Sequence, residues 1–213
     1  MTSKYIRWGG LAAILGGALL LTADGWSLVR EIFGLVPESF SEEAVTNTWT
    51  AMSVLFMCGG VLILLGLVGI YSRQAEEAGI LGLIGFLAAF VTMTLVVGAF
   101  WTFTFVAPSV AMEAPAFLDG EPAGPLGVGF ILTFFSFPAG LALFGIATFR
   151  ARVFPRMAAA ALTLGALVAF APFAGVTILL DAAVIWIGYS LYSERAAEAA
   201  SPEVTPPVQP AGT

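Results

Sequence analysis

The sequence predicts an all-α, polytopic membrane protein in which six transmembrane helices form a bundle and both termini are cytoplasmic. Composition is the first observation: 59% of the 213 residues are hydrophobic and 10% are charged, whereas an ordinary soluble domain is about 25% charged. Long apolar runs are the second observation, and a one-sided distribution of basic residues is the third. A chain with so few polar side chains cannot cover a water-exposed surface, which excludes a soluble enzyme and a disordered protein.

Residues 1–195 form the predicted transmembrane domain. A helix crosses the ~30 Å hydrocarbon core with ~20 apolar residues, because each residue adds ~1.5 Å. Four runs meet this requirement, and we predict one span in each of them: residues 8–23, 49–70, 79–106 and 126–149. The third run is long enough that we expect it to tilt or to emerge from the bilayer.

The last apolar run, residues 157–192, is too long for one span. As a single helix it would measure ~54 Å, and Pro172 interrupts it near its middle. Proline removes a backbone hydrogen bond and disfavours helix at the preceding residue. We therefore predict a hairpin with arms at residues 157–171 and 176–192. Arms of ~23–26 Å are short, so either the hairpin does not reach fully across or the bilayer thins around it.

The segments outside the spans are predicted to be surface elements. Apolar residues at helical spacing from Trp26 to Val36 indicate a separate amphipathic helix on the outer surface. Ser39 and Glu42 form a capping box that is typical of the start of the next helix. Four prolines predict an irregular loop over residues 107–125. Residues 196–213 are predicted to be a disordered, proline-rich cytoplasmic tail.

The orientation follows from the basic residues. With the N-terminus inside, every lysine and arginine except Arg30 is cytoplasmic, whereas the outer loops are acidic. A five-span alternative would place Arg195 outside and weaken this pattern. Lys4 and Arg7 before an apolar run also resemble a signal peptide. Leu21 is large for its position before the possible cleavage site, which favours an uncleaved first span.

Three short stretches resemble small multi-span bacterial membrane proteins of unknown function. They are Arg-Trp-Gly-Gly-Leu-Ala-Ala at residues 7–13, Phe-Arg-Ala-Arg-Val-Phe-Pro-Arg at residues 149–156 and Ile-Gly-Tyr-Ser-Leu-Tyr at residues 187–192. The resemblance implies a multi-pass protein of the bacterial cytoplasmic membrane. It implies no activity and no site residues.

Several kinds of chemistry are excluded by missing residue types. The chain has no histidine, which removes His-ligated haem, His-bound zinc and a Ser-His-Asp triad. No basic patch is present to bind nucleic acid, and no catalytic or phosphate-binding motif matches. Cys58 lies inside the second span and is expected to be a small buried hydrophobe. We therefore predict a protein that is not an enzyme and has no catalytic residue, metal site or cofactor.

Ionisable groups inside a bilayer are candidates for function because they are costly to place there. Asp181 lies five residues into the sixth span and Asp24 lies near the outer end of the first. With Asn47 they form the candidate site for an ion or substrate. The alternatives are aspartates that reach the surface or bond a nearby hydroxyl, or that pair with Arg30. Pro138, midway along the fourth span, is a candidate helix hinge or else a static packing kink.

Two functions remain open from the sequence. The first is an accessory or assembly component that works through helix packing, because small residues such as Gly9, Ala13 and Gly17 recur four apart and allow helices to approach closely. The alternative is a small transporter or channel that uses Asp181 near the outer face. The expected partners are the lipid bilayer and either a second copy of the chain or another membrane protein.

Overall fold

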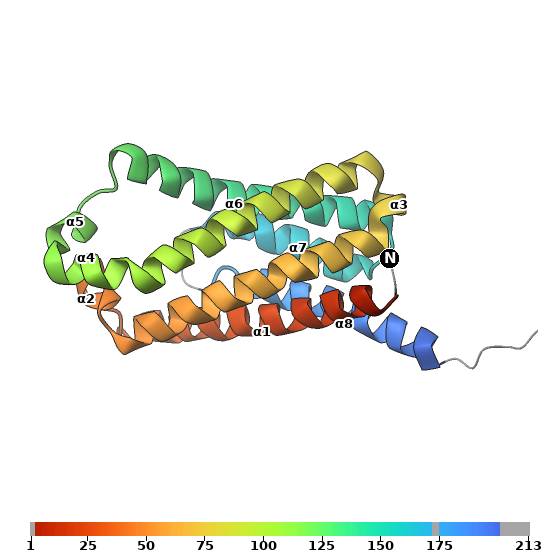
Figure 1. The fold of residues 1–213 in the computed structure, drawn as a ribbon, viewed down its shortest axis with the longest axis horizontal. Helices are drawn as coiled ribbons and strands as arrows, with labels where there is room; N and C mark the ends of the chain where they lie inside the picture. Colours follow the sequence, from red (N-terminus) through yellow and green to blue (C-terminus); the bar gives the residue numbers. More distant parts are fainter. Residues whose placement is uncertain (1–2, 172–174, 201–213) are drawn as a thin grey trace, which may run out of the picture.

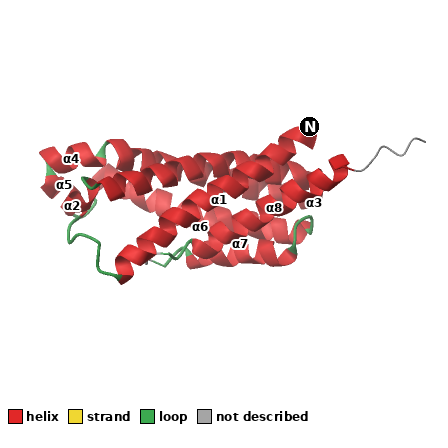
Figure 2. Ribbon diagram, turned by 90° about the horizontal axis from the view of Figure 1, so that it is seen from below, coloured by secondary structure: helices red, strands yellow, loops and turns green. Residues whose placement is uncertain are grey.

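The computed structural model describes residues 3–171 and 175–200, with side chains for residues 5–171 and 175–193. All regular secondary structure in this part of the chain is helical (Figures 1 and 2). Three helices are long and apolar enough to cross a membrane: α1 (Ser3–Ile32), α3 (Asn47–Phe105) and α6 (Gly124–Ala151). The predicted all-helical class is thus confirmed, and the three long apolar helices are consistent with the predicted membrane protein, whereas the number of spans stays a prediction.

Helix α3 reverses direction at Gly79, so its two halves pack as an antiparallel pair (Figure 1). Gly79 has φ +57° and ψ −149°, a conformation that only glycine adopts without strain. Stacked rings join the two halves, with centroids 4.5 Å apart for Tyr71–Phe86 and 4.4 Å apart for Phe56–Phe100. The helix continues past residue 70, the predicted end of the second span, as far as the glycine, so no multi-residue loop separates the two halves.

Helix α1 continues to Ile32, so the prediction of a separate surface helix from Trp26 was wrong. The apolar spacing that suggested it is the continuation of α1 itself. Gly34, with φ +63°, ends the helix. The amide of Leu35 bonds back to the carbonyl of Arg30 at 2.8 Å, as in other left-handed helix terminations.

Three short helices gather at one end of the bundle, which we call the cap end (Figure 2). They are α2 (Phe40–Ala44), α4 (Ala107–Glu113) and α5 (Pro115–Asp119). Ser39 does accept a bond from the Glu42 amide, at 3.3 Å, but it caps α2, and Thr46 caps α3. The loop predicted over residues 107–125 was only partly irregular, because Pro108 and Pro115 occupy the first turns of α4 and α5, where they fit well.

The predicted hairpin consists of α7 (Arg156–Val168) and α8 (Ile178–Ala200). The end of α7 and the start of α8 lie part-way along the bundle, whereas α1, α3 and α6 extend further towards the cap end (Figure 1). Pro172, on which the turn was predicted, lies outside the described residues. Helix α8 runs to Ala200, so the predicted tail does not begin at residue 196, and its remainder, residues 201–213, lies outside the described residues.

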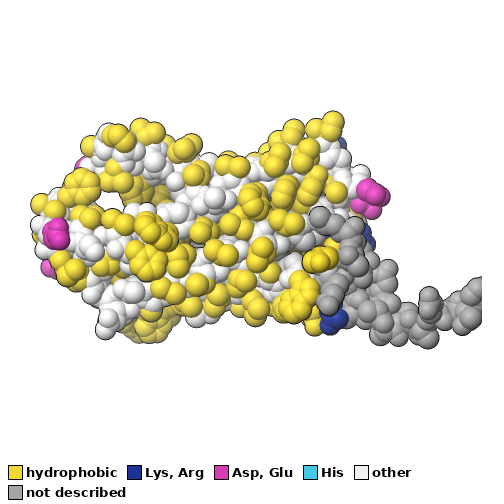
Figure 3. Space-filling model, in the orientation of Figure 1, with side chains coloured by type: hydrophobic (Ala, Val, Ile, Leu, Met, Phe, Trp, Pro, Cys, Tyr) yellow, Lys and Arg dark blue, Asp and Glu magenta, His cyan; other side chains and the backbone are white. Residues whose placement is uncertain are grey.

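The opposite end, which we call the N-terminal end, holds the start of α1, the turn at Gly79, the link between α6 and α7 and the end of α8 (Figure 1). Around it the helices meet at small residues. Gly9 of α1 faces Gly69 of α3, and Gly10 faces Gly188 of α8. On the face in Figure 3, hydrophobic side chains cover the length of the bundle and charged ones lie at its two ends. This distribution fits a membrane environment.

Candidate functional site

The structure brings Asp24 and Asp181 together, although 157 positions separate them in the sequence. Asp24 belongs to α1, about 12 Å before its cap end, and Asp181 lies in the first turn of α8. The antiparallel packing of these helices creates the pair, because Gly17 admits the backbone of Asp181 and the side chain of Ile185 against α1. Asp24, Thr177 and Asp181 line the same cavity, so the two carboxyl groups and the Thr177 hydroxyl lie close together.

A cavity of about 660 Å³ adjoins this pair. It lies beside the hairpin tip, where α7 and α8 stop short of the longer helices. Asp24, Ser27, Thr177 and Asp181 supply its polar side chains, and the rest of the lining is apolar and uncharged. Six phenylalanines contribute to that lining: Phe56, Phe100, Phe134, Phe135, Phe137 and Phe170. The site is therefore a pair of acids at the wall of an aromatic chamber.

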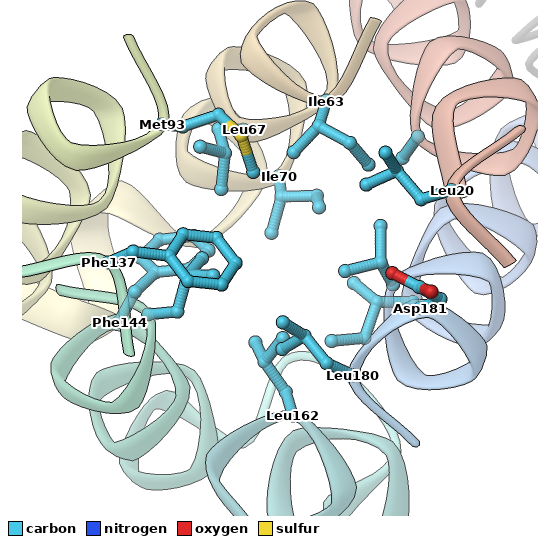
Figure 4. Close-up of a pocket in the computed structure, with 14 residues that line it drawn as sticks. Leu20, Ile63, Leu67, Ile70, Met93, Phe137, Phe144, Leu162, Leu180 and Asp181 are labelled. Atoms are coloured by element: carbon cyan, nitrogen blue, oxygen red, sulfur yellow. The ribbon is translucent and has the colours of Figure 1, made fainter. Parts of the chain in front are cut away.

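Asp181 is the most constrained member of the site. Asp181 is 2% exposed, and its Oδ2 atom has no hydrogen-bond partner among the described residues. Figure 4 shows the carboxyl group on α8 pointing among apolar side chains, including Leu20, Ile63 and Leu180. The space on that side is only about 20 Å³, and Asp181 is its one polar lining residue. A water molecule needs at least two polar partners, so this side is dry.

Asn47, the third predicted site residue, does not join the two aspartates. It is exposed at the first turn of α3 and lines a separate hollow with Thr22 and Trp26. The alternative that an aspartate pairs with Arg30 is also wrong. Arg30 forms a buried ion pair with Glu43 at 2.6 Å and donates to the carbonyl of Leu35 at 3.4 Å.

Pro138 lies inside α6 and is buried. The helix continues through it, and Ser136 donates to the carbonyl of Thr133 at 3.3 Å, whereas the carbonyl that the proline deprives of its helical donor is that of Phe134. The neighbouring residue Phe137 lines the cavity. Pro138 is thus next to the candidate site, and its role as a hinge stays a prediction.

The predicted small-residue faces form contacts between helices of the same chain. Gly66 and Gly188 both pack against Ala13, and Gly165 packs against Leu180. The threonines of the second half of α3 bond to carbonyls of their own helix, as Thr94 does to Phe90 at 2.8 Å. Cys58 is exposed on α3, so its predicted burial was wrong, because it faces away from the neighbouring helices.

One buried polar contact was missed from the sequence. Gln74, fully buried, donates to the Thr148 hydroxyl at 3.0 Å and so links α3 to α6. Its Oε1 atom has no partner within the described part of the chain. The polar stretch around Gln74 looked like a loop between two spans. A signal was present in the apolar residues three and four positions before it, which continue the buried stripe of α3.

The site offers two carboxyl groups and two hydroxyl groups, a set that can bind a cation or exchange a proton. No group of three or more Cys, Asp or Glu side chains capable of holding a metal ion occurs among the described residues. No known protein family, curated protein or solved structure matches the chain. The functional argument therefore rests on the geometry of the carboxyl pair and its cavity.

Proposed function

We propose that this protein is a small transporter of the bacterial cytoplasmic membrane, with the Asp24–Asp181 pair as its substrate or coupling-ion site. The buried carboxyl group of Asp181, placed next to Asp24 in the wall of an open cavity, carries the proposal. Two adjacent carboxyl groups away from bulk water need a proton or a cation between them. A helix contact that served packing alone would favour an apolar residue at this position.

The membrane topology in this proposal has both termini in the cytoplasm. Arg7, Arg73, Arg150, Arg152 and Arg156 belong to helix ends and links at the N-terminal end, which supports placing that end inside. α1, the two halves of α3 and α6 then cross the bilayer. The apolar parts of α7 and α8 measure about 20 and 24 Å, so this hairpin enters from the cytoplasmic side. It forms the fifth and sixth spans only where the bilayer is thin.

Transporters commonly place their sites at mid-membrane beside interrupted helices. The hairpin tip and the start of α8 have this arrangement here, because Asp181 lies within the first turn of a helix that begins part-way along the bundle. A carboxylate is also compatible with the positive end of the helix dipole. Pro138 of α6, beside the cavity, is the position at which we expect the bundle to bend during transport.

Water access tests the proposal directly. In a Cys58→Ala background, we would introduce Ser27→Cys and Thr177→Cys separately and treat intact cells with a membrane-impermeant thiol reagent. Both residues line the cavity, so both cysteines are expected to react. The matched control is the native protein, which retains Cys58. This cysteine is exposed on the outside of α3, close in sequence to the lining residues Phe56 and Gly60. Labelling of neither introduced cysteine, or equal labelling of all three, would overturn the transport route.

An accessory or assembly role is the second candidate, and a groove between α1 and α3 favours it. This groove of about 710 Å³ is lined by Trp8, Leu15, Leu65 and Val68, among others, and these four side chains are exposed. A photo-crosslinking residue at Leu65 is expected to capture one defined membrane protein if the groove seats a partner helix. Val128, exposed on α6, is the control position. Capture of lipid alone at both positions would remove this candidate.

A further inference from the structure

The cavity lining combines two acidic side chains with a largely aromatic surface, and this combination limits which ligands it can bind. The acids Asp24 and Asp181 lie at one wall, and six phenylalanines contribute to the remaining surface. Apart from the acids, the described residues that line the cavity from α1, α3, α6 and the hairpin include no charged side chain. An anion would meet two acidic groups and no basic one among them. A neutral apolar molecule would leave the negative charge of the acid pair without a counter-charge.

An inorganic cation is a poor match for the same surface. Hard cations take about six or more oxygen ligands. The side chains of Asp24, Ser27, Thr177 and Asp181 fall short of that number, because the Oδ2 atom of Asp181 is buried and does not face the cavity. A small, strongly hydrated ion would lose its water shell without a replacement. A large organic cation holds its water weakly and gains contact with aromatic rings instead.

The charge of the preferred ligand follows from the contact between the acids. Two adjacent carboxyl groups beside apolar surface repel each other when both are ionised, so such a pair keeps one proton. The Asp24–Asp181 pair therefore presents one negative charge. A single positive charge on the ligand balances it without displacing the shared proton.

The size of the cavity is also suitable. About 660 Å³ falls within the roughly 300–1,000 Å³ of pockets that enclose small organic molecules. The phenylalanine faces offer both apolar area and attraction for a cation, which strengthens when water is excluded. The dry space behind Asp181, at about 20 Å³, is too small for any part of such a ligand, so the ligand occupies the aromatic side.

We propose that the cavity binds lipophilic, singly charged organic cations, with the charge beside Asp24 and Asp181 and the apolar body among the phenylalanines. This rests on the proposed function, since it assigns a substrate class to the same site. The probe is tetraphenylphosphonium, and the matched probe is tetraphenylborate, which has nearly the same shape and the opposite charge. Each is measured separately, by equilibrium binding to the purified full-length protein in detergent micelles.

The expected result is saturable binding of tetraphenylphosphonium and at least tenfold weaker binding of tetraphenylborate. This comparison uses the native chain, so it does not depend on the folding of a variant. Asp181→Asn is expected to weaken tetraphenylphosphonium binding at least tenfold, and Asp24→Asn is the second variant at the pair. Asp119→Asn, an acid of α5 outside the cavity, is the control and is expected to leave binding unchanged.

Three outcomes would overturn the ligand class: no saturable binding of the cation, equal binding of both probes, or cation binding that neither aspartate substitution weakens. If Ser27→Cys and Thr177→Cys are labelled but the cation does not bind, the transport route is supported and the substrate class is wrong. If the cation binds through Asp181 but the cavity is not labelled, the ligand class is supported and the transport route fails.

Discussion

The two halves of the bundle are built on different principles. Towards the N-terminal end the hairpin fills the space between α1 and α6, and glycines bring helix backbones into contact, as at Gly9 and Gly69. Towards the cap end the hairpin is absent, a cavity opens, and an ion pair and aromatic contacts connect the helices. This contrast indicates that one half supplies the rigidity and the other holds the chemistry, as expected when function requires suboptimal packing.

Overpacking in the N-terminal half is expected to cause the greatest loss of stability. A Cβ atom on Gly69 would lie 2.7 Å from the Cα atom of Gly9, so the two helices must separate. Gly69→Val is expected to lower the free energy of unfolding by about 3 kcal/mol or more. Thermal and SDS-induced unfolding of the purified protein would measure this loss.

Gly98→Val is the control for that prediction. Gly98 lies in the second half of α3 and has open space around its Cβ position. Both substitutions place a β-branched residue in the same helix, so their intrinsic helix costs match, and the difference isolates packing between helices. Equal losses for the two variants would contradict the division of the bundle into a packed half and an open half.

The helical class was predictable from the sequence because an apolar run of bilayer length forms a helix in nearly every protein that contains one. Boundaries were less predictable. Gly79 alone reverses α3, and no local pattern distinguishes such a glycine from the many that serve packing. The segment from Trp26 was misassigned because amphipathic spacing is the same for a surface helix and for the end of a span. The cap of α2 at Ser39 was predictable, since its hydrogen bond involves only neighbouring residues.

The candidate site was predictable in its parts but not in its assembly. Asp24 and Asp181 stood out because acids in apolar runs are costly. Their contact depends on which helices pack together, which Gly10, Gly17 and Gly188 decide through close approach to α8 or α1. Small-residue faces can be recognised in a sequence, but each of them could pack against several different helices. Asn47 was grouped with the aspartates on depth alone, and depth does not specify the side of a helix.

The ion pair at the cap end is expected to give the next largest effect. Glu43→Gln leaves Arg30, which is 5% exposed, without its charged partner 2.6 Å away. We expect a loss of about 2–3 kcal/mol of unfolding free energy, because an unpaired buried charge is costly. Glu42→Gln is the control on the same short helix, since Glu42 is exposed. Similar stabilities of the two variants would show that polar contacts do not hold the cap end together.

A smaller effect is expected at the polar contact in the packed half. Thr148→Val removes the hydroxyl to which the Gln74 amide donates at 3.0 Å, and leaves both polar atoms of that amide buried. We expect a loss of about 1–2 kcal/mol. The double variant Gln74→Leu with Thr148→Val is expected to recover most of it, because no polar atom is then left unpaired. A double variant less stable than Thr148→Val would mean that Gln74 contributes more to packing than to hydrogen bonding.

The smallest predicted effect has the opposite sign and lies in the open half. Asp181→Leu replaces a buried carboxyl group that has an unpartnered oxygen with an apolar side chain next to free volume, so we expect unfolding free energy to rise by about 0.5–1 kcal/mol. Asp119→Leu is the matched control, because Asp119 accepts two bonds from Ser41, at 2.9 and 2.7 Å. Loss of this carboxyl group is expected to lower the unfolding free energy by about 1 kcal/mol.

The changes in unfolding free energy of the two variants are compared. Opposite signs would mean that Asp181 is retained for binding at a cost in stability. A loss of stability in both would mean that Asp181 belongs to the structural framework, and the contrast between the two halves would then disappear at the one residue on which the proposed function depends.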